Sequence, residues 1–490
     1  MLSYWLGASE IRNRIYIPKY HDPGLRAELE ALAGTHLLLR VGDLVDAGVL
    51  SLDTGHEIGS DAYGTGNIPF VRTSDISNWE IKTAPKQGVS EQVYSIYGPR
   101  QDVREGDILL VRDGTYLIGT NCFVTAADSK LLFQSHILRI RVEKPGVVSP
   151  EAVFLALNGD LVQRQIRSVQ FTADIIDTIG QRFSEVLLPI PKDPPRRREA
   201  TAALNEFLKT RVSGKSFVKQ APLLFENVLA TGKVEPIHAF LDASADELAS
   251  VLVQDTVTLE FGGFEAAWID REKIRDGIYL PKYYDPEISL ELGKLSATCD
   301  VVSVGELVER SILEWTTGHE PGKMAYGTGE IPFIRTSDFA NWEIKHDPKH
   351  GLAEYIYEMY RESQDVRAED ILLVRDGTYL VGSSTMVNQG EERMVFCGGL
   401  YKLRSLDRRS LPPHLLLALL NSYIVKRQIR SKQFTRDVID TVGRRLDEVL
   451  LPIPKDAGLR RELAEIVCRV VEARLRARDG IKALARDSER

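Results

Sequence analysis

The feature that most constrains the fold of this chain is an internal repeat. Residues 55–82 read GHEIGSDAYGTGNIPFVRTSDISNWEIK and residues 318–345 read GHEPGKMAYGTGEIPFIRTSDFANWEIK, with 21 of 28 positions identical. The same offset of 263 residues relates DILLVRDGTYLIG at Asp107 to DILLVRDGTYLVG at Asp370, and LLPIPKD at Leu187 to LLPIPKD at Leu450. Because no insertion interrupts this offset, the sequence predicts two copies of one domain, from about residue 4 to 193 and from about residue 267 to 456.

Within each copy, short apolar runs alternate with turn signals. Ile108–Val111 and Ile137–Val142 have the character of strands. Ser149 followed by Pro150 is a favourable helix start, and we expect one helix to continue through EAVFLALNGDLVQRQIRS. The pattern predicts a mixed, strand-rich α/β domain.

After Pro191 and Pro454 the sequence changes to helix-forming residues. In the second copy, apolar residues recur at alternating spacings of four and three, which is the seam of a coiled coil. The residues of this seam are Leu459, Leu463, Ile466, Val470, Ala473 and Ala477, and the first copy has a shorter seam of Leu204, Phe207, Leu208 and Val212. We therefore expect long helices that join the two domains and pack on each other as an antiparallel coiled coil.

The composition is that of a folded protein and excludes several functional classes. Of 490 residues, 43% are hydrophobic and 27% are charged, so the disordered and collagen-like classes are excluded. No secretory signal and no apolar run of about 18–20 residues occurs, which predicts a cytoplasmic protein with no membrane partner. The four cysteines are scattered singly, which favours neither disulfides nor zinc. A net charge of −8 argues against a uniformly basic nucleic-acid binder, although local basic patches remain compatible with it.

The repeated blocks resemble a known family, the specificity subunits of type I restriction-modification systems. IPFVRTSD at Ile68, DILLVRDGTYLIG, and QFT leading to LLPIPK look like the recurring core of that family, in order and twice. One departure follows the Ile-Pro-x-Pro segment, where the family often continues with Pro-Leu-x-Glu-Gln. Here Asp-Pro-Pro-Arg-Arg and Asp-Ala-Gly-Leu-Arg follow, which leaves the contacts between helices and partners less defined.

The resemblance implies a non-catalytic DNA-recognition subunit. It would bind a bipartite double-stranded target and present an adenine to DNA adenine methyltransferase subunits docked along its helices. Those subunits would bring S-adenosylmethionine, and a motor-nuclease subunit would bring ATP and magnesium, so this chain would bind no cofactor or metal itself. The implied boundaries are 1–192 and 264–455 for two target-recognition domains, 193–230 and 456–490 for helical spacers, and 231–263 for a connector.

Candidate DNA contacts come from polar positions within the repeated blocks. Arg-Thr-Ser-Asp brings a guanidinium and hydroxyls to the end of a strand, as phosphate and base contacts require. Gln134-Ser135-His136 stands opposite Cys397-Gly398-Gly399, so these loops are candidates for the difference in specificity. Residues 425–445 hold seven Lys or Arg and two Asp, a local excess of five positive charges, which suggests contact with phosphates. The candidates are Arg72, Thr73, Ser74, Arg112, Gln134, His136, Arg167, Gln170, Arg335, Thr336, Ser337, Arg375, Lys426, Arg430, Lys432, Gln433 and Arg436, with Leu204, Phe207, Leu208, Leu459, Leu463, Ile466 and Val470 on the partner-binding helices.

Two alternative functions remain open at this level. Asp75 with Glu80-Ile81-Lys82, repeated in the second copy, could hold magnesium in a stand-alone nuclease, although an Asp in a turn and a Glu on a strand edge is the preferred interpretation. The same domain pair could also serve another phage-defence system. His56 and His319 recur in Gly-His-Glu turns, for which a structural hydrogen bond is favoured over a metal ligand.

Overall fold

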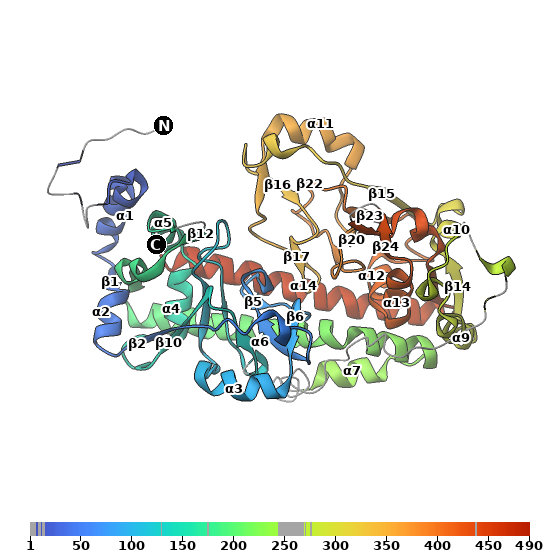
Figure 1. The fold of residues 1–490 in the computed structure, drawn as a ribbon, viewed down its shortest axis with the longest axis horizontal. Helices are drawn as coiled ribbons and strands as arrows, with labels where there is room; N and C mark the ends of the chain where they lie inside the picture. Colours follow the sequence, from blue (N-terminus) through green and yellow to red (C-terminus); the bar gives the residue numbers. More distant parts are fainter. Residues whose placement is uncertain are drawn as a thin grey trace. The chain divides into compact units, whose positions relative to one another are not determined.

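In the computed structural model, the described residues are 6–7, 11, 15–128, 130–173, 176–243, 269, 271–274, 277–436 and 439–490. They form two compact units, whose elements are labelled in Figure 1. Unit 1 contains the chain up to Val212 together with Arg476–Arg490, and unit 2 contains the described residues from Ser213 to Leu475. Most of the predicted connector, residues 244–263, lies outside the described residues.

Unit 1 is built on small sheets. A four-stranded antiparallel sheet has the order β2 (Leu50–Thr54), β10 (Ile137–Val142), β7 (Ile108–Val111), β8 (Asn121–Phe123). A three-stranded sheet has the order β6 (Gln87–Val89), β3 (Ile68–Val71), β9 (Leu132–Phe133). The strand pairs are β1 (His36–Arg40) with β13 (Leu187–Pro191), β4 (Ile76–Ser77) with β5 (Glu80–Ile81), and β11 (Phe171–Ala173) with β12 (Ile176–Thr178). The strands predicted at Ile108–Val111 and Ile137–Val142 are confirmed.

Unit 2 repeats this plan strand for strand. Its four-stranded sheet is β15 (Leu313–Thr317), β23 (Leu400–Ser405), β20 (Ile371–Val374), β21 (Ser384–Met386), and its three-stranded sheet is β19 (His350–Leu352), β16 (Ile331–Ile334), β22 (Val395–Phe396). The pairs are β14 (Cys299–Ser303) with β26 (Leu450–Pro454), β17 (Phe339–Ala340) with β18 (Glu343–Ile344), and β24 (Phe434–Arg436) with β25 (Ile439–Thr441). The predicted class, two homologous strand-rich α/β domains, is confirmed.

Short helices accompany these sheets. In unit 1 they are α1 (Pro23–Leu32), α2 (Val41–Asp46), α3 (Glu91–Gln101), α4 (Pro150–Leu157) and α5 (Asp160–Ser168). In unit 2 they are α7 (Glu235–Asp242), α9 (Pro286–Leu295), α10 (Val304–Glu309), α11 (Glu354–Gln364), α12 (Pro413–Asn421) and α13 (Tyr423–Ser431).

The helix expected after Ser149 is two helices. Its start is as predicted, because the Ser149 hydroxyl accepts a hydrogen bond from the Ala152 N–H. It ends at Leu157, however, and Gly159 takes an extended conformation before α5 begins. A side chain in place of Gly159 would collide with the Glu489 carboxylate, since its Cβ would lie 2.1 Å from Oε1. The Glu489 carboxylate, which belongs to the same unit, therefore lies against the chain where α4 ends and α5 begins.

Two long helices, α6 (Pro194–Thr231) and α14 (Ala457–Asp487), contribute to both units (Figure 1). In unit 1, Gly480 of α14 lies against the Phe207 ring of α6. In unit 2, Gly214 of α6 lies against the Arg474 stem of α14, so close that a Cβ on the glycine would be 2.5 Å from the arginine Cγ. The Arg196 guanidinium of α6 also donates to the Asp487 carbonyl of α14 in unit 1. Because residue 196 lies opposite 487 and residue 207 opposite 480, the two helices run antiparallel in this unit, as predicted.

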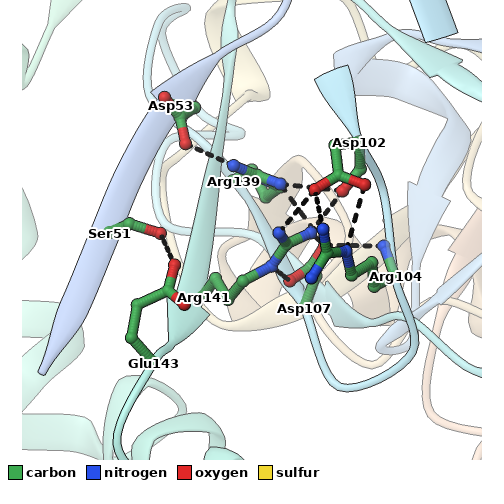
Figure 2. A network of polar contacts seen from close by, with 8 residues as sticks. All are labelled: Ser51, Asp53, Asp102, Arg104, Asp107, Arg139, Arg141 and Glu143. Carbon is green, nitrogen blue, oxygen red and sulfur yellow. Dashed lines mark hydrogen bonds and ion pairs between the residues drawn. The ribbon is translucent and has the colours of Figure 1, made fainter. Parts of the chain in front are cut away.

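An ionic network around the buried Asp107 carboxylate braces the four-stranded sheet of unit 1 (Figure 2). Arg141 on β10 bonds to both oxygens of Asp107, at 2.7 and 2.8 Å, and to Asp102 at 2.9 Å. Asp107 is 1% exposed and directly precedes β7, so the network lies at the start of that strand. Arg404 makes the equivalent bonds to Asp370 and Asp365 in unit 2. With every charge partnered, this network is a brace for the sheet.

No helix in the described part of the chain is both long enough and apolar enough to cross a membrane.

Candidate nucleic-acid interface

The predicted Arg-Thr-Ser-Asp and Gln-Ser-His segments meet at one edge of the three-stranded sheet. Strands β3 and β9 are parallel, with Val71 paired to Phe133, so Arg72 and Gln134 leave the two strands side by side. The Gln134 N–H donates to the Val71 carbonyl at 3.0 Å, which fixes this neighbourhood. Arg72 and Gln134 are both partly exposed. A guanidinium and an amide therefore stand together at the carboxyl ends of two strands.

The end of β7 joins the same cluster. The His136 carbonyl accepts from the Arg112 N–H at 3.0 Å, and the His136 ring bonds through Nδ1 to the Asp113 carboxylate at 3.0 Å. The Arg112 guanidinium also contacts Asp113, at 3.2 Å, and its side chain is 30% exposed. Burial alone would raise the pKa of Asp113, but hydrogen bonds from Thr178 and His136, with the Arg112 charge, hold it below its usual range. This carboxylate therefore stays ionised and orients the Arg112 guanidinium and the His136 ring.

Unit 2 has the same backbone arrangement at this sheet edge, but Cys397-Gly398-Gly399 replaces Gln134-Ser135-His136. Cys397 takes the place of Gln134, since its N–H donates to the Ile334 carbonyl at 2.9 Å, and it lies beside Arg335. Asp376 bonds to Arg375 at 2.8 Å and to the Thr441 hydroxyl at 2.5 Å. Cys397 is 5% exposed, and burial raises the pKa of its thiol to about 11, so the thiol stays protonated.

Glycine at the third position of this loop lies close against the threonine of the repeated motif. A Cβ on Gly399 would lie 3.1 Å from the Thr336 methyl carbon and 3.7 Å from the Asp376 Cβ. The structure therefore brings Arg335, Thr336 and Arg375 to one edge of unit 2, as it brings Arg72 and Arg112 together in unit 1. Thr73, Ser74 and Ser337 follow the arginines in the same turns.

Four residues that are predicted to contact DNA hold the Asp-Gly-Thr-Tyr loop that follows β7 or β20. Arg167 donates to the Thr115 and Tyr116 carbonyls, at 3.4 and 2.9 Å, and Gln170 donates to the Thr115 carbonyl at 2.9 Å. Arg430 and Gln433 make the equivalent bonds to the loop of unit 2. These four side chains thus donate to backbone carbonyls within their own domain. The geometry indicates that they hold the Asp-Gly-Thr-Tyr loop in position.

Two cations of the basic stretch 425–445 are paired with carboxylates. Arg427 is surrounded by three carboxylates of α9 and its cap, Asp285 at 2.8 Å, Glu291 at 3.5 Å and Glu287. Lys432 pairs with Glu448 at 3.1 Å and lies 4.3 Å from the centre of the Tyr283 ring. Arg427 and Lys432, two of the seven cations counted along this stretch, are therefore compensated by carboxylates of their own domain, and contact of the stretch with phosphates stays a prediction.

Two other residues of this stretch differ from Arg427 and Lys432. Lys426 is partly buried, which lowers the pKa of its ammonium group to about 8. Arg436 ends β24, but its side chain lies outside the described part of the structure.

The Asp and Glu-x-Lys set behind the nuclease alternative is engaged in structural contacts. The Asp75 carboxylate accepts from the backbone N–H groups of Arg72 at 3.0 Å and Lys86 at 3.5 Å, and burial raises its pKa. Glu80 forms an ion pair with Arg211 of α6 at 3.0 Å. Among the described residues, no group of three His, Cys, Asp or Glu side chains could hold a metal ion. The preferred interpretation, a turn aspartate and a strand-edge glutamate, fits these contacts.

The sequence interpretation missed the role of the repeated Asn-Trp-Glu motif, which docks each domain on the long helices. Asn78 and Trp79 both have positive φ, 49° and 64°, as a tight hairpin turn between β4 and β5 requires. The Trp79 indole N–H donates to Asn158 at 2.8 Å. Its repeat equivalent in unit 2, Trp342, lies against Phe217 and Phe225 of α6, with ring centres 6.0 and 6.2 Å away.

The ion pair behind this docking also repeats at the offset of 263. Arg211 of α6 pairs with Glu80, and Arg474 of α14 pairs with Glu343 at 3.2 Å. Both arginines are at most 4% exposed. The offset relates Arg211 to Arg474 as it relates the motifs, and that signal in the helical segments could have revealed the contact.

The seam residues predicted to bind partners are buried in this chain's own cores. Their exposed fractions are at most 8% except for Phe207, which is partly buried against the unit 1 core. Leu204, Leu208 and Phe207 belong to the core of unit 1, whereas Leu459, Leu463, Ile466 and Val470 belong to that of unit 2. Helix packing uses these side chains, so a partner protein must meet other faces of the helices.

His56 and His319 of the repeated Gly-His-Glu turns bond to Gln101 and Gln364, as expected for structural hydrogen bonds.

These features define a duplicated α/β protein in which each domain carries a polar strand-end cluster and docks on paired helices. Among solved structures, the chain matches the type I restriction-modification system S subunit from M. genitalium, with 12% identity, 92% of each chain covered and a TM-score of 0.34. It also matches the HsdS subunit from Thermoanaerobacter tengcongensis, with 17% identity over 93% of this chain and 95% of that chain and a TM-score of 0.28.

A further match is a chain from a structure of the type I R-M system, with 16% identity over 93% of this chain and 98% of that chain and a TM-score of 0.27. These three matches cover 92–93% of this chain at 12–17% identity. No protein-family model and no curated protein sequence matches the chain significantly.

Proposed function

We propose that this chain is the non-catalytic DNA-recognition subunit of a type I restriction-modification complex. Its two target-recognition domains, 1–192 and 264–455, each bind one half of a bipartite double-stranded site. The spacers 193–230 and 456–490, with the connector 231–263, join them and dock adenine methyltransferase subunits, and in a restricting complex a motor-nuclease subunit. S-adenosylmethionine, ATP and magnesium belong to those partners, and the complex works in the cytoplasm.

One observation carries this proposal: the same polar cluster is built twice, from residues far apart in the sequence. In each domain, two arginines and a hydroxyl-bearing turn converge where β3 and β7, or β16 and β20, end. Arginine binds guanine or phosphate through two parallel hydrogen bonds, and hydroxyls bind phosphates. Two such clusters in one chain suit a target with two recognised halves.

The proposed DNA contacts follow from this geometry. Arg72, Thr73, Ser74, Arg112, Gln134 and His136 serve the first half-site, and Arg335, Thr336, Ser337 and Arg375 serve the second. Arg167, Gln170, Arg430 and Gln433 act through the Asp-Gly-Thr-Tyr loops that they hold. Lys426 and Arg436 remain candidates for phosphate contact, while Lys432 is assigned to its pair with Glu448.

Selection from a randomised pool of double-stranded DNA by the purified full chain tests the proposal. We expect enrichment of two short sequences at a fixed separation, followed by adenine methylation at that site when the chain is expressed with its methyltransferase subunit. Cleavage of DNA by the purified chain with magnesium alone would overturn the proposal in favour of a nuclease, and enrichment of no sequence would also reject it.

A further inference from the structure

A position beside the repeated arginine differs between the two domains in a way that the motifs do not reveal. Gln87 opens β6 and is paired with Phe70 of β3, and His350 opens β19 and is paired with Phe333 of β16. The pairing is antiparallel, so the residue two places after each phenylalanine lies diagonally across from this position. That residue is Arg72 in one domain and Arg335 in the other.

The scaffold around this position is the same in both domains. Tyr63 stacks on Phe70 with ring centres 5.5 Å apart, and Tyr326 stacks on Phe333 with ring centres 5.4 Å apart. The lysine before the variable residue is also the same, Lys86 in one copy and Lys349 in the other. The exchange of glutamine for histidine therefore occurs on a constant frame, where it changes only the chemistry offered next to the arginine.

In unit 2, His350 restrains the arginine. The Arg335 guanidinium donates through Nη1 to His350 Nε2 at 3.4 Å, and the imidazole stacks on Tyr326 with ring centres 4.4 Å apart. Burial lowers the pKa of His350, and the positive charges of Lys349 and Arg335 lower it further. A neutral imidazole keeps a lone pair on Nε2 with which to accept this bond. Arg335 is exposed, so its other donors remain directed outward.

In unit 1, the amide of Gln87 is available. The side chain is partly exposed, and within the described part of the chain its amide makes no hydrogen bond. A free amide presents a donor and an acceptor on the same plane, which is the combination that pairs with both N6 and N7 of adenine. Neutral histidine already bonded to an arginine cannot offer that pair of groups.

We propose that the position occupied by Gln87 and His350 is a specificity determinant that makes the two half-sites differ. This inference rests on the proposed function. It assigns a guanine to both half-sites, as the base that the repeated arginine reads. Gln87 reads an adenine next to that guanine in the first half-site. His350 makes no such contact in the second half-site and holds Arg335 on its guanine.

The test is an exchange at this position in the full chain, read out by selection from the randomised double-stranded pool. His350→Gln is expected to give the second half-site a preference for adenine beside its guanine, by roughly tenfold or more. The reverse change, Gln87→His, is expected to remove the adenine preference from the first half-site. The reciprocal readout in separate half-sites distinguishes base recognition from a loss of folding.

Matched controls come from repeat-equivalent residues on α3 and α11. Ile96→Met and Met359→Ile exchange side chains that are 54% and 69% exposed, and they should leave both half-sites unchanged. The inference is overturned if the parent selects a bipartite sequence and both exchanges leave its half-sites as they were. If the parent selects no sequence at all, it is the proposed function that fails.

Discussion

Arginines that occupy equivalent places in the repeat have different surroundings, and the surroundings decide what each one contributes. The Arg427 side chain is 10% exposed and lies among three carboxylates. Its repeat equivalent, Arg164, is 37% exposed and pairs with Glu28 on the surface. Water screens the second pair more strongly than the first, so equal formal charges differ in their effect on stability.

This contrast predicts the outcome of a matched pair of substitutions. Arg427→Ala leaves three partly exposed carboxylates without their cation and should destabilise unit 2 by about 1–3 kcal/mol. Arg164→Ala should cost at most about 1 kcal/mol. Chemical denaturation of both variants measures the difference. A stable Arg427→Ala protein with a weaker salt dependence of DNA binding would restore the original expectation of a phosphate-binding surface.

The strand-end arginines should behave in the opposite manner. Arg72→Ala should relax base preference in the first half-site and Arg335→Ala in the second, each by about 1–3 kcal/mol, with little effect on unfolding. Sequence selection and thermal unfolding of each variant provide the measurement. Arg26→Ala removes an exposed cation paired with Glu30 and serves as control. Equal affinity and unchanged preference in both variants would remove these arginines from the interface.

At the scale of helices and strands, the sequence predicts those features that depend on residues close together in the chain. The strands at Ile108–Val111 and Ile137–Val142 and the helix start at Ser149 follow from apolar runs and a capping serine. The helix break at Gly159 does not, because it accommodates Glu489, whose carboxylate accepts from the Leu161 N–H across 328 residues of chain.

In the candidate nucleic-acid interface, too, the sequence predicts some features, whereas others depend on contacts between residues far apart in the chain. The repeat marks Arg72 and Arg335 without any structure, since both copies keep the motif. Compensation of Arg427 by carboxylates 136–142 residues away cannot be read from charge counts along the chain. Nor can the sequence show that Gln87 lies beside Arg72, because strand register sets that neighbourhood.

The packing of the long helices predicts a large loss of stability on truncation of their seam. Leu463 and Ile466 are fully buried in the unit 2 core, so each change to alanine should cost about 2–5 kcal/mol. Arg469→Ala, on the same helix, is the control because that side chain is exposed. Denaturant unfolding of the variants checks this. Stability equal to that of the control would contradict the paired-helix interpretation.

The ends of the long helices predict a pH dependence. Glu489 accepts the Leu161 N–H at the start of α5, and its repeat equivalent Glu226 accepts the Ile424 N–H at the start of α13. Burial raises the pKa of Glu489 to about 7 and that of Glu226 to about 6, from 4.5. The folded state therefore holds these protons more tightly than the unfolded state, and stability falls as pH rises from 4.5 through these values.

Neutral glutamine should remove this penalty while it keeps an acceptor oxygen. The Tm of Glu489→Gln minus that of the parent should increase as pH is raised from 4.5 to about 7 and then level off. For Glu226→Gln the increase should be complete by about pH 6. Thermal unfolding across this range measures both, and differences that do not vary with pH would show that these carboxylates do not titrate with folding.

For the whole molecule, the duplication is reciprocal. Glu226 follows the first domain in sequence and caps a helix of unit 2, whereas Glu489 follows the second domain and caps a helix of unit 1. The two contacts are equivalent in the repeat: the offset of 263 residues relates Glu226 to Glu489, and each glutamate caps a helix of the other copy. Under the proposed function, this reciprocal arrangement predicts that the chain reads related half-sites on opposite strands.

The target should therefore be a gapped, imperfect inverted repeat. Arg72 and Arg335 favour shared bases, while Gln134-Ser135-His136 against Cys397-Gly398-Gly399 predicts positions that differ. Transplanting residues 120–142 onto positions 383–405 should make the half-sites more alike, because the second domain then carries the loop side chains of the first. Methylation mapping with the partner subunit reads this out. Parent half-sites without inverted similarity would reject the symmetry argument, and half-sites that are unchanged by the transplant would reject these loops as readers of sequence.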